Sequence, residues 1–180
     1  MTEMLSIRPA AQADIPLLHA LVESAYRGDS ARRGWTHEAD LLGGQRTDPD
    51  TLAALIADPR QCLLLAFSGG EPVGCVQVSK VTEGIAYLGM LAVDPARQAG
   101  GLGRTLIAAA EDHARRAFGA GTMEMTVIRQ RGELIAYYQR RGYALTGEER
   151  PFPLADARFG LPINPDLAFV VLARSLSAEG

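Results

Sequence analysis

The chain has 180 residues, of which 47% are apolar and 22% charged, and its formal net charge is −3. These values are typical of one soluble globular domain rather than a disordered chain, and no apolar run approaches the roughly 18 residues of a membrane span. A slightly acidic chain is a poor binder of nucleic acid.

Several further classes of protein are excluded by what the sequence lacks. Residues 1–10 do not show the basic start and apolar core of a secretory signal. Cys62 and Cys75 each lie inside an apolar run, and the three histidines are scattered without zinc spacing. We therefore expect a cytoplasmic protein with two buried thiols, no metal, and no nucleic-acid or membrane partner; a bridge between the two cysteines is the alternative.

The first sixty residues are predicted to form one strand and three helices. The strand covers Leu5–Ala10, and Asp14 caps the first helix. A short helix follows at His37–Leu42, and the pair Asp48–Pro49 starts the third. Apolar residues recur at helical spacing in the first and third helices, namely Leu17, Leu18, Leu21 and Val22, then Leu52, Leu55 and Ile56.

After Pro59 the pattern indicates three strands in succession. Gln61–Phe67 is a continuous apolar run, and Ser68–Glu71 is a turn. Val73–Val81 alternates as the hairpin partner of that run, and Ile85–Val93 is apolar on both faces. The last of these is the pattern of a central strand covered on both sides.

A glycine-rich turn, QAGGLG at residues 98–103, connects the central strand to a helix closed by Gly119 and Gly121. Amide groups at such a helix start favour an anion, especially a phosphate. Leu106 stands where a dinucleotide fingerprint needs its third glycine, and a Walker lysine is absent. A tight turn that needs glycine for its backbone angles is the alternative. The buried face of this helix is predicted to carry Leu106, Ile107 and Ala110. Its exposed face is predicted to carry Arg104, Glu111, Asp112, Arg115 and Arg116.

The remaining residues complete a single α/β domain. A fifth strand alternates Met123, Met125 and Val127 on one face with Glu124 and Thr126 on the other. Next come a helix at Glu133–Arg141 ended by Gly142, a strand from Tyr143, a proline-rich loop at Gly147–Pro165 and a closing strand at Leu167–Leu172. Neither a repeat nor a linker interrupts residues 1–180, and the core is expected over about 5–176.

Two strings resemble the signatures of one enzyme family. Residues from Leu91 read LAVDPARQAGGLGRTLI, and Leu134–Tyr143 read LIAYYQRRGY. The first resembles the acetyl-CoA-binding motif of the GNAT acetyltransferases, and the second their apolar-Tyr-x-x-x-Gly-Phe/Tyr helix. The resemblance implies a GNAT fold with a mixed, mostly antiparallel sheet of about six or seven strands and about four flanking helices. It also implies a V-shaped splay between the fourth and fifth strands.

The resemblance implies acetyl-CoA as co-substrate. Leu91–Val93 would hold the pantetheine arm, and the glycine turn would hold the pyrophosphate. Arg131 stands where the family often has an asparagine that contacts the arm. The coenzyme-binding residues implied in this way are Leu91, Ala92, Val93, Gln98, Ala99, Gly100, Gly101, Leu102, Gly103, Arg104, Thr105 and Arg131.

The chemistry implied is direct attack of a primary amine on the thioester, with a backbone N–H near Leu91 stabilising the oxyanion. Tyr138 matches the family's tyrosine that protonates the CoA thiolate; a packing aromatic is the alternative. Tyr87 stands where many members carry a glutamate, so Glu124 on the neighbouring strand is the predicted base. A solvated or salt-bridged Glu124 is the alternative.

The expected acceptor is a small-molecule amine. In the family the acceptor pocket is lined by segments that correspond to Tyr26–Asp40 and Glu148–Pro165. Arg32 and Arg33 could hold a carboxylate, and Asp29, Glu38 or Asp40 an ammonium group, with a solvated loop as the alternative. Two other functions stay open: a non-catalytic CoA-binding module, and acetylation of a protein or peptide. Many relatives dimerise, but no apolar stripe settles whether this chain forms a homodimer.

Overall fold

The computed structural model of the chain describes residues 5–26, 42–43, 48–94, 101–151, 161–162 and 168–176. Seven strands form one sheet in the order β1-β3-β4-β5-β6-β9-β7. Only β5 and β6 pair in parallel, and the other neighbours are antiparallel. The mixed, mostly antiparallel sheet is therefore confirmed. The strands are β1 Leu5–Pro9, β3 Gln61–Ser68, β4 Glu71–Thr82, β5 Ile85–Val93, β6 Thr122–Ile128, β7 Ala144–Pro151 and β9 Ala168–Ser175; β2 Leu42–Gly43 and β8 Leu161–Pro162 pair separately.

Helices cover both faces of the sheet. Four α-helices lie within the described ranges, namely α1 Ile15–Tyr26, α2 Pro49–Ala57, α3 Leu102–Phe118 and α4 Gly132–Arg140, and a 3-10 turn, η1 Gln12–Asp14, precedes α1. Leu18, Val22 and Leu52 of α1 and α2 pack with Leu63 and Leu65 of β3 in one core cluster. The second cluster joins α3 and α4 to the opposite face, through residues that include Leu106, Ile107, Met123, Met125 and Tyr138. No described helix has the length and apolarity to cross a membrane.

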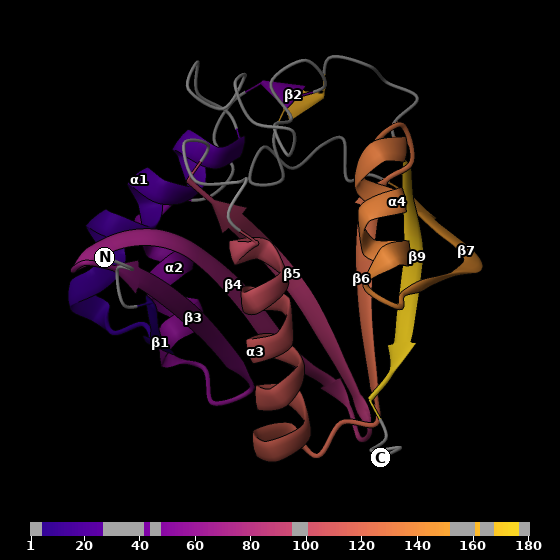
Figure 1. The fold of residues 1–180 in the computed structure, drawn as a ribbon, viewed down its shortest axis with the longest axis horizontal. Helices are drawn as coiled ribbons and strands as arrows, with labels where there is room; N and C mark the ends of the chain where they lie inside the picture. The colour runs from indigo at the N-terminus through magenta and orange to yellow at the C-terminus, as the bar shows by residue number, and fades with distance from the viewer. Residues whose placement is uncertain are drawn as a thin grey trace.

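The sheet opens into a V between β5 and β6. Their registered pairing covers only Ile85–Tyr87 opposite Thr122–Glu124. Beyond these pairs the strands diverge, as Figure 1 shows, and α3 and α4 lie on separate sides of the opening. We call β1, β3, β4 and β5 with α1, α2 and α3 the first arm, and β6, β9 and β7 with α4 the second arm. The splay predicted between the fourth and fifth strands of the sequence is confirmed.

Local chemistry accounts for several element boundaries. The Asp48 carboxylate accepts a hydrogen bond from the Thr51 N–H at 2.7 Å, and Pro49 is the first residue of α2. Gly69 and Gly70 have φ of 58° and 85°, which suits the tight turn between β3 and β4. These predicted boundaries are confirmed. Cys62 and Cys75 are buried thiols that form no disulfide, as predicted.

The start of α1 differs from the prediction. Asp14 does not cap α1 but ends η1, where its carboxylate accepts the Ala11 N–H at 2.7 Å and pairs with Arg8 at 2.8 Å. The short polar side chain therefore reaches back to the turn before the helix. Leu17 is 43% exposed, because the buried stripe of α1 runs through its neighbours Leu18, Leu21 and Val22 instead.

The second half also contains more strand than the sequence indicated. Gly147–Pro151 belongs to β7 rather than to a loop, because a register shift after Leu145 and a φ of 87° at Gly147 let the strand continue past a bulge. The closing strand β9 runs to Ser175. Leu42 lies in β2 rather than in the expected helix, and the rest of that helix lies outside the described residues.

Candidate active site

A β-bulge interrupts β5 where the V is open. Gln77 of β4 is in register with Gly89, and Cys75 with Ala92, so Met90 and Leu91 stand opposite one residue of β4. Met90 has a φ of 46°, a left-handed conformation that is uncommon outside glycine. Bulges of this kind redirect backbone groups and occur often beside active sites. The bulge includes Leu91, the first residue of the segment Leu91–Val93 that was predicted to hold the pantetheine arm and the residue near which the oxyanion was expected.

The N-terminus of α3 follows β5 closely in space. Gly101 is the N-cap residue with a φ of 75°, and Leu102 is buried. A Cβ atom on Gly74 of β4 would lie 2.8 Å from a methyl carbon of Leu106, so this glycine lets α3 approach the sheet closely. Gln98, Ala99 and Gly100, predicted to bind the pyrophosphate, lie outside the described residues.

Gly103 and Tyr137 meet across the V, since one belongs to α3 and the other to α4. A Cβ atom on Gly103 would lie 2.8 Å from the Tyr137 Oη, whereas nothing lies within 4 Å of such an atom on Gly101. The two glycines therefore serve different purposes: Gly101 provides a left-handed backbone, and Gly103 provides space. The sequence did not single out Tyr137, because its neighbour Tyr138 occupies the family's motif position.

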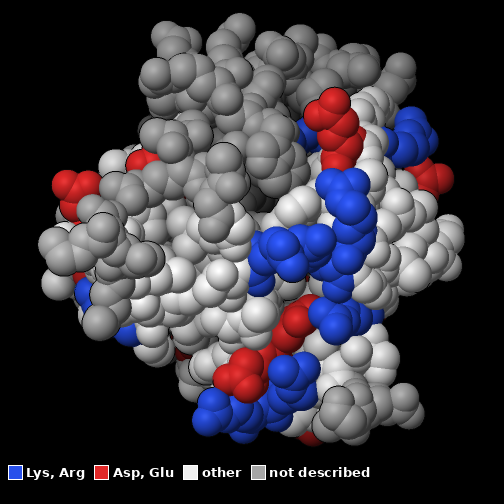
Figure 2. Space-filling model, viewed as in Figure 1, with Lys and Arg blue, Asp and Glu red and all other residues white. Residues whose placement is uncertain are grey.

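Three arginines surround Tyr137 and make this end of α3 basic. Arg104, Arg140 and Arg141, which we call the basic trio, each oppose the rise that burial causes in the Tyr137 pKa. The Arg141 guanidinium also lies 5.3 Å from the centre of the Tyr137 ring. Figure 2 shows basic side chains gathered over α4 and toward the start of α3. Arg140 and Arg141 had no predicted role, although the double arginine at the end of α4, where Arg140 is the last residue and Arg141 the C-cap, was a visible signal.

The other predicted coenzyme contacts are distributed differently. Thr105 is exposed and its hydroxyl donates to the Gly101 carbonyl at 3.3 Å. Arg131 is the N-cap residue of α4. The structure does not bring Arg131 to the basic trio, because it precedes α4 whereas Arg140 ends it, about 13 Å away along the helix axis.

Tyr138 lies in the core beside the opening. Its side chain is 5% exposed, and its ring meets those of Tyr137 and Tyr143 edge-on, with centroid distances of 5.4 Å and 6.2 Å. This environment is compatible with both interpretations of Tyr138, since a phenol must be shielded from water to donate to a thiolate and a packing aromatic must be buried. Its role as the acid stays a prediction.

Polar residues on the face of the sheet opposite α3 and α4 lie near the apex of the V. The Tyr87 hydroxyl is hydrogen-bonded to the Thr126 hydroxyl, which ties β5 to β6 just where their pairing ends. Glu124 lies 3.5 Å from the Arg150 guanidinium, so the salt-bridged alternative describes its resting state. The predicted acceptor residues Arg32, Arg33, Asp29, Glu38 and Asp40 lie outside the described residues. Over the described ranges, no group of three or more His, Cys, Asp or Glu side chains could hold a metal ion.

Comparison with known proteins agrees with this architecture. The model of the acetyltransferase (GNAT) family matches residues 21–143. The ribosomal-protein-S18-alanine N-acetyltransferase from Escherichia coli superposes with a TM-score of 0.70 at 20% identity, over 98% of this chain and 97% of its own. No curated protein matches the sequence.

Two further solved structures share the fold. The protein yncA from Salmonella typhimurium, solved with its cofactor acetyl-CoA, has a TM-score of 0.72 at 20% identity over 98% of this chain and 96% of its own. A variant of the spermidine N-acetyltransferase SpeG from Vibrio cholerae has a TM-score of 0.70 at 14% identity, over 96% and 94%. At these identities the likeness concerns the fold.

Proposed function

Because the chain belongs to the acetyltransferase (GNAT) family, whose members use acetyl-CoA, we propose that it transfers the acetyl group of acetyl-CoA to the primary amine of a small molecule. One observation carries the proposal: the start of α3 meets Tyr137 and its basic trio at the opening of the V, and α3 packs over Gly74 next to Ala92, the residue that follows the bulge of β5. Acetyl-CoA carries phosphates, a pantetheine arm and a thioester in a row. Its binding site therefore needs a basic surface, a helix start and a strand with exposed backbone groups next to one another.

The coenzyme's phosphates would bind at the start of α3. Amide groups there carry the positive end of the helix dipole, and Arg104, Arg140 and Arg141 add full positive charges. Charge-assisted hydrogen bonds contribute roughly 1.5–3 kcal/mol each, so two or three of them supply much of the about 8 kcal/mol of a micromolar complex. The pantetheine arm would run from there along Leu91–Val93.

The transfer itself forms a C–N bond and breaks the C–S bond of the thioester. The amine attacks the carbonyl carbon, and a backbone N–H at the bulge beside Leu91 stabilises the developing oxyanion. Tyr138 gives its proton to the departing thiolate, and Glu124 receives a proton from the amine. Glu124 acts from the face of the sheet opposite α3 and α4, from which the acceptor approaches. In the structure its carboxylate is ion-paired with Arg150.

The two adjacent tyrosines allow a matched test of the acid. Replacing Tyr138 with Phe should lower kcat at least about tenfold and leave the acetyl-CoA affinity unchanged, since a positioned acid contributes roughly a hundredfold or more. Replacing Tyr137 with Phe should instead change mainly the affinity, because its hydroxyl lies at Gly103. Steady-state kinetics and calorimetry measure the two quantities. If Tyr138→Phe keeps full turnover and Tyr137→Phe loses it, the acid is Tyr137.

The acceptor class is tested by release of free thiol from acetyl-CoA. Small primary amines should accelerate the release, whereas a non-catalytic CoA-binding module would show no acceleration with any amine. A panel of peptides with free N-termini forms the second arm, since a structural neighbour is named for acetylating a ribosomal protein and another for acetylating spermidine. Faster release with peptides than with small amines would contradict the proposed acceptor class.

A further inference from the structure

A buried carboxylate lies on α3 where the sequence indicated an exposed one. Glu111 was predicted to face outward, but it is 6% exposed. The reason is its position: it follows Ile107 by four residues and Ala110 by one, so it belongs to the same inward stripe of the helix. An unneutralised carboxylate at such a site is costly, so its partners decide what it does.

The partners of Glu111 both belong to the second arm. The Arg174 Nη1 donates to the two carboxylate oxygens at 3.1 Å and 2.9 Å, and the Tyr143 hydroxyl donates at 2.8 Å. Gly142 makes the approach of Arg174 feasible, since a Cβ atom there would lie 3.1 Å from the arginine Nε. We call Glu111, Tyr143 and Arg174 the Glu111 clamp.

The hydroxyl of Tyr143 is held in its donor form. Burial and the negative charge of Glu111 both raise the pKa of this tyrosine, with burial the larger cause. The clamp therefore keeps its hydrogen-bond pattern at neutral and mildly alkaline pH. Since Glu111 is on the first arm and its partners are on the second, the clamp joins the two arms on the side of the sheet that carries α3 and α4.

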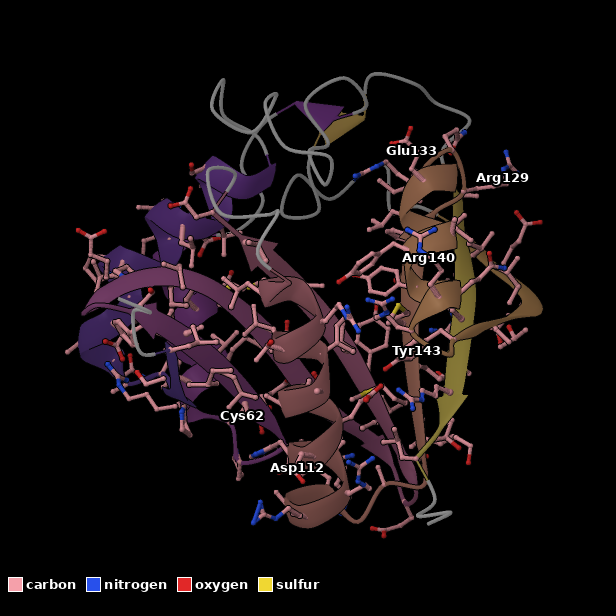
Figure 3. All side chains as sticks on the ribbon, in the orientation of Figure 1. Cys62, Asp112, Arg129, Glu133, Arg140 and Tyr143 are labelled. Carbon is pink, nitrogen blue, oxygen red and sulfur yellow. The ribbon has the colours of Figure 1, made fainter. Side chains whose placement is uncertain are left out.

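Tyr143 also connects the clamp to the candidate acid. Its ring contacts the Tyr138 ring edge-on at a centroid distance of 6.2 Å. Figure 3 labels Tyr143 just beyond the end of α4, and Gly101 and Arg104 lie at the start of α3, N-terminal to Glu111 on the same helix. Glu111 is therefore connected in two directions: along α3 to Gly101 and Arg104, and through Tyr143 to Tyr138.

We propose that Glu111 is a positioning residue that sets the separation of the arms, and thereby the distance of Tyr138 from the coenzyme bound at the start of α3. The proposal rests on the proposed function. It also gives a reason for the Gly-Tyr pair that closes the second signature in this chain: Gly142 leaves space for Arg174, and Tyr143 supplies the hydroxyl. A Phe at position 143 would keep the ring but not the hydrogen bond.

The test uses Glu111→Gln, Tyr143→Phe and their double variant, with Asp112→Asn as the matched control. Asp112 is the next residue on α3 and pairs with Arg116 at 2.9 Å on the exposed side, so its substitution removes one charge without touching the clamp. Circular dichroism and thermal denaturation select a temperature at which all variants are folded. At that temperature, kcat and KM for acetyl-CoA are measured by thiol release, and the affinity for CoA by calorimetry.

We expect Glu111→Gln to lower kcat about tenfold or more, because small displacements of a catalytic group are costly, and Tyr143→Phe to have a smaller effect. The double variant should be about as active as Glu111→Gln alone, since the two residues act as one unit. Asp112→Asn should stay within about twofold of the wild type. A lower melting temperature for Glu111→Gln with kcat, KM and CoA affinity equal to those of the control would overturn the proposal, because a purely structural clamp behaves in that way. A wild-type chain that neither binds CoA nor releases thiol would refute the proposed function itself, and the positioning role with it.

Discussion

Substitution of the two glycines at the start of α3 tests separately whether a glycine is needed for its backbone conformation or for the space that its missing side chain leaves. Gly101 has a φ of 75° and open space around its missing side chain, whereas Gly103 is the second residue of α3 and its missing Cβ would be 2.8 Å from the Tyr137 Oη. Alanine at Gly101 is therefore a backbone perturbation, and alanine at Gly103 is a steric perturbation of the site.

The expected effects on stability have opposite signs. An L residue in the left-handed conformation costs about 1–2 kcal/mol, so Gly101→Ala should destabilise the fold by that amount. Alanine is about 0.5–1 kcal/mol better than glycine inside a helix, and the tip of a tyrosine can move, so Gly103→Ala should leave stability unchanged or slightly raised. A difference of about 2 kcal/mol corresponds to melting temperatures about 4–8 °C apart for a domain of this size.

Coenzyme binding should respond differently from stability. A methyl group at Gly103 displaces the Tyr137 hydroxyl and narrows the approach of a diphosphate, so Gly103→Ala should weaken acetyl-CoA binding about tenfold, or 1.4 kcal/mol. Gly121→Ala is the control, because a Cβ there meets nothing within 4 Å. Thermal denaturation and calorimetry provide the measurements. Wild-type affinity of Gly103→Ala for acetyl-CoA, or a melting temperature of Gly101→Ala no lower than that of Gly103→Ala, would refute these roles of the two glycines.

Three further predictions concern charge and burial. Replacing Arg140 and Arg141 together with Gln should weaken CoA binding at least about tenfold and flatten its dependence on salt, as a calorimetric titration at two ionic strengths would show. The Arg8 guanidinium holds the pKa of Asp14 below its usual range, so this pair stabilises the fold at neutral pH and the benefit disappears as the pH falls below about 4. The melting temperature of Asp14→Asn should accordingly lie below that of the wild type at pH 7, and the two should converge in acid. Burial raises the pKa of the Cys62 thiol, so alkylation at pH 8 should be slow in the folded chain and fast in denaturant; equal rates would contradict its burial.

The amino-acid sequence alone determined the elements and most of the motif positions. Strand alternation, the Asp48–Pro49 helix start and the glycine at the end of α3 are local signals, in which a residue acts on its own backbone or on that of residues a turn away. The resemblance to GNAT acetyltransferases placed a coenzyme turn after β5 and a tyrosine on α4. The charge of Glu111 led to the wrong prediction that its side chain is exposed, although its helical spacing from Ile107 places it on the buried face of α3.

Only the tertiary structure decided which residues from different elements meet. Tyr137 lies at the candidate site because α4 brings its hydroxyl to Gly103, and Glu111 is buried because Arg174, sixty-three residues later, neutralises its charge. A hydrogen bond between distant segments leaves no periodic pattern in the sequence, since the sequence around each partner determines only the helix or strand to which that partner belongs. The contact forms when the packing of the arms removes water from the Glu111 carboxylate, whereas Arg174 stays partly exposed, and that condition is a property of the whole fold.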